Sequence, residues 1–154
     1  MKYASILLLA LIWLTACGSD NEPENPKNNQ INTIANVLNG KFVNSKYSEA
    51  TNTTETREIT FTPFSSPKTE SWTNNGITKD VAMYGTCVFT TYFNDHLLQV
   101  DKNWKYNINI AYTGATPELI LYPDIYGRTE SYDLKVIDNS SISLDGDVFN
   151  KKSK

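Results

Sequence analysis

Few residues of the chain have the chemistry that catalysis needs. The only histidine, His96, follows Asp95, and such a pair could belong to a catalytic triad, but no Gly-x-Ser-x-Gly turn supplies a serine nucleophile. A single histidine also cannot build the usual zinc site. Asp145-Gly146-Asp147 begins like a calcium loop, yet no further ligands follow at the required spacing, so the segment is typical of a turn. We expect no enzymatic activity, no metal and no cofactor.

The two cysteines predict different chemistry. Cys17 follows an apolar stretch, Ile6–Leu14, which itself follows the positive charge of Lys2. These nine residues suit the core of a secretory signal and are far fewer than the ~20 residues of a membrane-spanning helix. The thiolate of Cys17 is a nucleophile that can take a lipid chain. Cys87 then has no partner for an intrachain disulfide, and we expect a buried apolar side chain rather than a reactive or dimer-forming thiol.

Leu14-Thr15-Ala16-Cys17 resembles the bacterial lipobox, in which a leucine and two small residues precede a lipid-bearing cysteine. The resemblance implies cleavage between Ala16 and Cys17 and a mature chain that begins at Cys17. It also implies that Cys17 carries a thioether-linked diacylglycerol and an amide-linked acyl chain such as palmitate. Several acyl chains hold a protein stably on a membrane. The alternative is an ordinary secretory signal with an incidental cysteine.

The segment after the signal peptide (residues 1–16) is polar and predicts a flexible tether over residues 17–36. It is rich in Asn, contains Pro23 and Pro26, and has almost no apolar side chains that could offset the entropy lost on ordering. An acidic run directly after the cysteine resembles the surface-export signal of Bacteroidota lipoproteins. We therefore expect lipid anchoring in the outer membrane, either on the cell surface or on the periplasmic face.

The charge balance excludes one class of partner. The chain has 14 basic and 17 acidic residues, a net charge of −3, and removal of residues 1–16 takes away Lys2 and leaves −4. A mildly acidic domain lacks the basic surface that nucleic acid requires. The chain after the tether is long enough for one domain, and its 8 Tyr, 6 Phe and 2 Trp supply material for a core.

Alternating apolar and polar residues predict an antiparallel sheet for nearly everything after residue 40. Ile31, Ile34 and Leu38 first indicate one short helical turn. No later segment is helical enough for a parallel crossover. Gly85, inside the longest strand-like run, suggests a bulge or sharp bend. Nine or ten short strands are expected near residues 40–47, 54–64, 68–72, 79–94, 96–101, 104–112, 118–122, 132–137, 141–144 and 148–149, with turns that include Ser65-Ser66-Pro67 and Lys102-Asn103.

The segment Leu38-Asn39-Gly40-Lys41-Phe42-Val43 resembles the start of lipocalin-like domains, where Gly-x-Trp opens the first strand after a small helix. Phe42 stands where that family has its tryptophan. In overall layout the chain also resembles the small lipocalin-like lipoproteins of Bacteroidota. The resemblance implies an all-β fold, an antiparallel up-and-down β-barrel, in a single domain over residues 37–150. An immunoglobulin-like β-sandwich, with Greek-key rather than nearest-neighbour pairing, is the alternative.

Aromatic residues are the candidates for binding. A barrel of eight strands can enclose one small apolar ligand, so the first hypothesis is an envelope protein that binds such a ligand. The alternative is a surface interaction module with a filled barrel, whose exposed rings stack on a glycan or dock on an outer-membrane protein. The same rings could also simply fill the core or pair on the surface. The candidates are Trp72, Tyr92, Trp104, Tyr112 and Tyr122.

Overall fold

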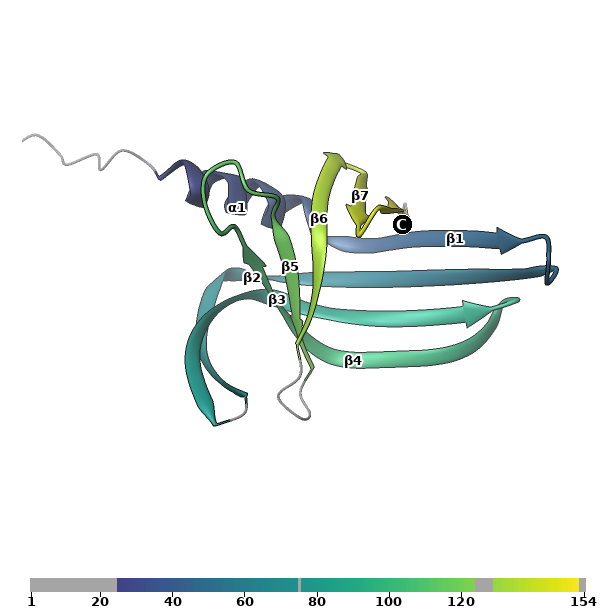
Figure 1. The fold of residues 1–154 in the computed structure, drawn as a ribbon, viewed down its shortest axis with the longest axis horizontal. Helices are drawn as coiled ribbons and strands as arrows, with labels where there is room; N and C mark the ends of the chain where they lie inside the picture. Colours follow the sequence, from purple (N-terminus) through teal and green to yellow (C-terminus); the bar gives the residue numbers. More distant parts are fainter. Residues whose placement is uncertain (1–24, 75, 124–128, 153–154) are drawn as a thin grey trace, which may run out of the picture.

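The computed structural model describes residues 25–74, 76–123 and 129–152, which form one helix and eight strands (Figure 1). The expected signal peptide, the cleavage position at Ala16 and the lipidation site Cys17 lie outside the described residues. Within that part of the chain, no helix has the length and apolar character to cross a membrane. The elements are α1 (Pro26–Val37), β1 (Gly40–Ser48), β2 (Thr53–Asn74), β3 (Ile77–Phe93), β4 (His96–Asn109), β5 (Glu118–Tyr122), β6 (Glu130–Asp138), β7 (Ser141–Leu144) and β8 (Asp147–Lys151).

The eight strands form a closed antiparallel barrel in which each strand pairs with its neighbours in sequence. β8 closes the barrel on β1 through the register pairs Phe42↔Lys151 and Val43↔Asn150. This order is that of an up-and-down barrel and is consistent with a lipocalin-like fold. The predicted all-β barrel is confirmed, and the described strands do not have the Greek-key order of an immunoglobulin-like sandwich.

Side chains fill the centre of the barrel. Alternation along each strand turns one set of residues inward, and in β3 this set includes Cys87, which the sequence predicts to be buried. The ring of Phe61 packs edge-on against Phe42 and Tyr106, with centroids 6.0 and 5.3 Å apart. The core residues with no more than 2% exposure are Leu38, Phe42, Ile59, Phe61, Met83, Cys87, Tyr106, Ile108, Ile110, Leu119, Leu121, Leu134, Ile142 and Phe149.

Helix α1 is longer than the single turn expected, and it packs on the barrel core. Asn25 caps its first turn, because its side chain accepts a hydrogen bond of 3.1 Å from the Lys27 N–H, and Pro26 suits the first helical position. The tether prediction is therefore wrong for residues 26–36. Burial of apolar side chains at helical spacing offsets the entropy lost on ordering this polar segment. The buried residues of α1 are Ile31, Ile34 and Val37.

Two segments predicted as turns instead continue a strand. Ser65-Ser66-Pro67 lies within β2, where the register with β3 shifts between Pro63 and Lys68, so the segment forms a bulge. Lys102-Asn103 lies within β4. The described chain therefore has eight strands, several of them long, in place of the nine or ten short strands expected. Pairing with a long neighbouring strand outweighed the local turn preference of these residues.

Gly85 marks the point where the β2–β3 hairpin bends away from the barrel. It lies opposite the bulge in β2 and pairs with Tyr106 of β4. A Cβ atom on Gly85 would lie 2.4 Å from the carbonyl oxygen of Thr62 and 2.7 Å from the Tyr106 ring, so only glycine fits. The predicted irregularity is confirmed. Beyond it, Lys68–Asn74 and Ile77–Met83 form what we call the curled hairpin, which bends back beside the barrel (Figure 1).

The opposite ends of β1–β4 run past the barrel as a sheet that we call the extension (Figure 1). β8 pairs with β1 only at Phe42 and Val43, and β5 pairs with β4 only from Lys105 onward. Among the described strands, none therefore continues the extension on either side. The extension comprises Asn44–Ser48, Thr53–Arg57, Thr90–Phe93 and His96–Asp101.

Candidate binding cleft under the curled hairpin

Two of the five candidate aromatic residues meet between the curled hairpin and β5. The rings of Trp72 and Tyr122 pack edge to face, with centroids 5.0 Å apart. Leu121 points into the barrel core, so the next residue, Tyr122, points to the outside of the barrel. Tyr122 is nevertheless only 7% exposed, because the hairpin lies over it. The curl thus buries the outward-facing Tyr122 against Trp72, which itself stays half-buried.

Polar contacts hold the curled hairpin against the barrel. The ammonium group of Lys105 in β4 donates to the Glu70 carboxylate over 2.5 Å, an ion pair that is about one-third exposed on each side. The side-chain amide of Asn107 donates to the carbonyl oxygen of Ala82 over 2.6 Å. Together with the ring contact, these bonds fix the position of the hairpin at three separate points.

A cleft of about 310 Å³ opens beside the aromatic pair. One wall is a single face of the curled hairpin, because the register pairs Trp72↔Lys79 and Asn74↔Ile77 put their side chains on the same side. The cleft combines an aromatic surface, aliphatic side chains and polar groups, which is the usual composition of a small-ligand site. It is lined by Trp72, Asn74, Ile77, Lys79, Val81, Tyr122 and Thr129.

The aromatic pair also supplies hydrogen-bond donors. The indole N–H of Trp72 is buried and has no acceptor among the described residues. Leaving such a donor unsatisfied costs about 1–3 kcal/mol, and because the nitrogen is buried, a ligand oxygen recovers this energy only if the indole turns toward the cleft. Burial raises the pKa of the Tyr122 phenol above its ordinary value, so this hydroxyl stays protonated and can donate at neutral pH.

The other three candidates lie elsewhere. Trp104 packs beside Phe89 against the barrel core, with ring centroids 6.3 Å apart. Tyr92 belongs to the extension, where it pairs with Leu97. Tyr112 is 70% exposed and follows the end of β4. None of the three lines the cleft, so the structure does not bring all five candidates together.

Sequence reasoning missed Ile77, Lys79 and Val81 as lining residues. The sequence does contain a signal for these three residues. The Asn74-Asn75-Gly76 turn sets the register of the hairpin, and alternation along the strand then puts their side chains on the same face as Trp72. The curl that carries this face to Tyr122 has no comparable signal. It depends on the close approach of the β2 backbone and of the Tyr106 ring to one glycine.

The residues weighed for catalysis do not form a reactive cluster in the described part of the chain. No group of three or more His, Cys, Asp and Glu side chains there could hold a metal ion. Burial raises the pKa of the Cys87 thiol to about 12, which leaves it protonated at neutral pH. Asp145 adopts a φ of 50° and accepts a hydrogen bond of 2.7 Å from the Asp133 N–H, as expected for a turn residue.

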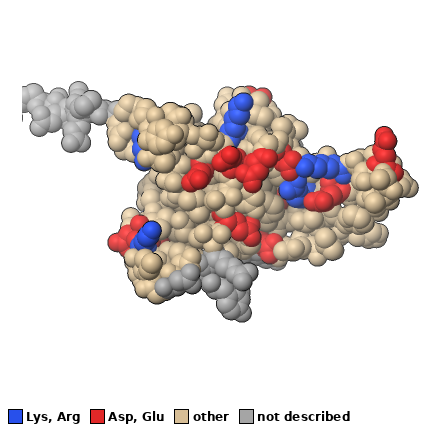
Figure 2. Space-filling view, in the orientation of Figure 1, with Lys and Arg blue, Asp and Glu red and all other residues tan. Residues whose placement is uncertain are grey.

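Asp147, considered above as part of a calcium loop, instead joins two cations. Its carboxylate accepts from the Lys46 ammonium group over 2.5 Å and from the Arg57 guanidinium. These hydrogen bonds, from Lys46 first and Arg57 second, hold the pKa of Asp147 below its ordinary value. Figure 2 shows acidic and basic side chains meeting where the extension leaves the barrel. The network connects β8 to β1 and β2 and so has a structural role.

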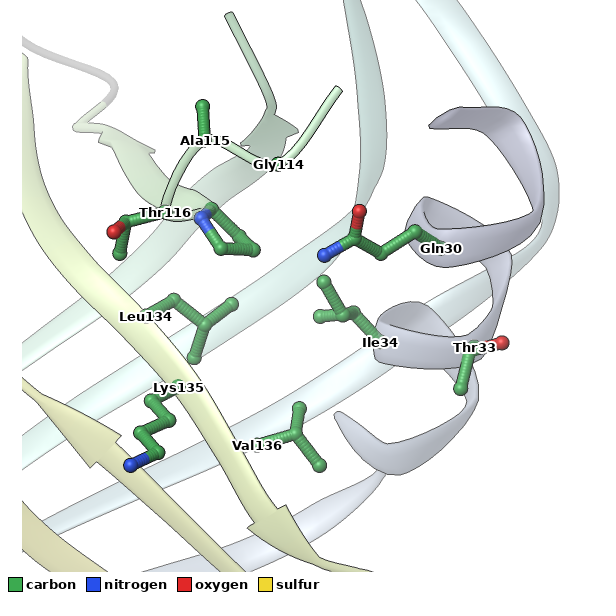
Figure 3. Close-up of a pocket in the computed structure, with 10 residues that line it drawn as sticks. Gln30, Thr33, Ile34, Gly114, Ala115, Thr116, Leu134, Lys135 and Val136 are labelled. Carbon is green, nitrogen blue, oxygen red and sulfur yellow. The ribbon is translucent and has the colours of Figure 1, made fainter. Parts of the chain in front are cut away.

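A second groove, of about 470 Å³, lies between α1 and β6. Figure 3 shows Gln30 and Ile34 of α1 facing Leu134 and Val136 of β6 across it. No aromatic side chain is among the residues that line this groove, and Ile34 and Leu134 already belong to the barrel core. We therefore assign the candidate site to the cleft, which has aromatic rings and several donors.

The barrel centre is packed with aromatic and aliphatic side chains. The rings of Phe42, Phe61 and Tyr106 pack against one another there and line none of the four grooves considered. Their side chains are at most 1% exposed.

Comparisons with known proteins do not place the chain in a family. No family model matches the chain, and no curated protein or solved structure is significantly similar to it. The function is therefore argued from the sequence and from the geometry of the cleft.

Proposed function

We propose that this protein is a lipid-anchored, non-enzymatic binding protein of the bacterial outer membrane that takes a glycan in a surface cleft. The observation that carries the proposal is the meeting of Trp72 and Tyr122 under the curled hairpin. A sugar unit packs one apolar face on an aromatic ring and directs its hydroxyls to the surrounding polar groups. The lipid on Cys17 holds the domain at the membrane, on the cell surface or on its periplasmic face.

The composition of the cleft supports a sugar over a purely apolar ligand. Asn74 and Thr129 offer hydrogen-bonding groups beside the rings, and Lys79 adds a positive charge. An ammonium group attracts carboxylates, so an acidic sugar such as a uronic acid is the preferred class. The volume of about 310 Å³ lies at the lower end of ligand sites and suits a small saccharide.

The filled centre of the barrel favours this surface site over the first hypothesis, a small apolar ligand inside the barrel. A lipophilic dye tests that difference. We expect no saturable dye binding to the mature chain in which Cys17→Ser removes the lipid. Saturable binding of about one dye molecule per chain would support the hypothesis of a ligand inside the barrel and would count against the proposal.

Calorimetric titration with neutral and uronic-acid oligosaccharides tests the cleft. The Cys17→Ser mature chain is expected to bind at least one acidic saccharide, and Trp72→Ala to weaken its affinity about tenfold or more, because stacking area and a donor are lost. Tyr112→Ala is the matched control, since Tyr112 is an exposed aromatic residue outside the cleft. The proposal would be overturned if Trp72→Ala bound the saccharide as tightly as the chain that keeps Trp72. It would also be overturned if no saccharide bound.

A further inference from the structure

The free side of β4 in the extension points to a second interaction surface. β4 pairs with β3 from His96 to Tyr106 but with β5 only from Lys105 onward. Within the described ranges, no strand pairs with His96–Asp101 on its other side. Backbone N–H and C=O groups along that side are therefore available to another strand.

Three of the six residues of this edge are exposed and apolar, and the edge lacks the cover that protects the opposite edge. On β1, Asn44 donates to the Val148 carbonyl over 2.7 Å and Lys46 pairs with Asp147. Sheets commonly guard their edges in this way, with charged side chains or covering segments. Most of the lower margin of the extension, where β4 runs in Figure 1, shows no charged side chain in Figure 2. The exposed apolar residues of the β4 edge are Leu97 (60%), Leu98 (69%) and Val100 (36%).

A register shift in β4 gives this edge an unusual pattern of faces. Leu97 pairs with Tyr92 of β3, and Val100 pairs with Thr90. Tyr92 and Thr90 are two residues apart in β3 and share one face of the sheet. Leu97 and Val100 therefore share that face too, although they are three residues apart, because Leu98 is the extra residue of a bulge.

The pattern is complementary to itself. His96 and Asp101 share the opposite face, because their partners in β3 also share a face. If a second copy lies antiparallel along this edge, with a two-fold axis perpendicular to the sheet, each face meets the same face of the partner. Leu97 then lies opposite Val100 of the second copy, and His96 lies opposite Asp101. Apolar side chains meet apolar ones, and an imidazole meets a carboxylate.

We propose that two copies of this chain associate through β4, edge to edge, into one continuous sheet with the two barrels at opposite ends. The occupant is a second copy rather than an unrelated strand because residue pairing and charge pairing both hold under the two-fold operation. The cleft under the curled hairpin stays open in each copy, since its lining residues are not part of the extension. The dimer thus contains two copies of the cleft, and its formation does not depend on which ligand the cleft binds.

Sedimentation equilibrium of the Cys17→Ser mature chain, over a wide range of concentrations, tests the association. Leu97→Lys is expected to weaken it about tenfold or more, because each copy then carries an unpaired cation opposite an apolar residue. The exposure of Leu97 lets the monomer keep its fold, which an unchanged thermal midpoint verifies. Val148→Lys, at an exposed position on β8, is the matched control and leaves association unchanged. A chain that stays monomeric at all concentrations, or a dimer insensitive to Leu97→Lys, would refute the proposal.

Disulfide trapping tests the register. Chains carrying Leu97→Cys, mixed with chains carrying Val100→Cys, are expected to form a covalent dimer on mild oxidation, because these positions lie opposite each other. Neither variant alone brings its two new cysteines together. Efficient trapping of either variant by itself would show a different register and overturn the pairing. Asp101→Lys is expected to weaken the dimer, and the added change His96→Asp to restore it; failure to restore would also contradict the pairing.

Discussion

Cys87 is a residue whose ionisation is tied to folding. Its thiol is 1% exposed in the barrel core, and burial raises its pKa to about 12. An unfolded chain has a cysteine pKa of ~8.5. Because the folded pKa is the higher one, the thiol contributes stability that is complete below pH ~8.5 and is lost as the pH rises toward 12.

We expect the free energy of unfolding, measured in urea, to fall between pH 8 and pH 10 through this residue. Burial also raises the pKa of Tyr106 and adds to the loss above the ordinary range of tyrosine. Cys87→Ala is expected to make the free energy of unfolding less dependent on pH. It should also lower that free energy at every pH, because it leaves a small cavity. A thiol reagent should modify Cys87 far more slowly in the native chain than in urea; equal rates would contradict the buried thiol.

Asp147→Asn is expected to lower the free energy of unfolding at pH 7 by roughly 0.5–1 kcal/mol, a modest amount because the carboxylate is partly exposed. Lys46 and Arg57 lower the pKa of Asp147, so its contribution is present above the ordinary carboxyl range and is lost as the pH falls through the folded pKa. Urea titrations should therefore show the variant and the natural chain converging in acid. Glu49→Gln, at an exposed position, serves as the control.

At the scale of the elements, Gly85 decides where the curled hairpin lies. Gly85→Ala is expected to destabilise the fold by about 1–3 kcal/mol, since a methyl group would collide with backbone atoms of Thr62 and Pro63 that cannot turn aside. It should also displace Trp72 from Tyr122, which a change in tryptophan emission would report. Thr86→Ala, one residue further on, is the control. An unchanged melting temperature and emission would mean that the bend does not depend on the glycine.

The sequence predicts the strands well and their curvature poorly. The burial of Cys87 is predicted correctly, since the apolar character of a lone cysteine in a strand-like run is a local signal. The merging of two short strands across Ser65-Ser66-Pro67 is not local, because it needs the whole length of β3 as a partner. Trp72 and Tyr122 could each be named as candidates from residue type. The contact between the two rings could not be predicted, because it depends on the bend of the hairpin at Gly85.

For the whole molecule, the proposed attachment through Cys17 would determine which parts face away from the membrane. Only eight residues separate Cys17 from Pro26, where α1 begins, and a fully extended chain of that length spans at most ~30 Å. Figure 1 shows the start of α1 and the tip of the extension at opposite ends of the molecule. A lipid on Cys17 would therefore keep α1 near the membrane and leave the extension free to reach other molecules.

Cys17→Ala is expected to move the protein from the membrane fraction to the soluble fraction of the cell envelope, because the acyl chains are the proposed attachment. Immunoblots of the two fractions measure this, and Cys87→Ala is the control that should stay with the membrane. Retention of Cys17→Ala in the membrane would show that another feature holds the protein, and the proposed anchoring would fail.

The separation of the cleft from the barrel core has an evolutionary consequence. Ile77, Lys79 and Val81 line the cleft, but none of them belongs to the buried core cluster. Substitutions at these three positions change the shape and charge of the cleft while the packing of Phe61 and Tyr106 is preserved. Ligand preference can therefore drift under selection without a matching loss of stability. We expect descendants of a common ancestor to diverge fastest along the curled hairpin and slowest in the barrel.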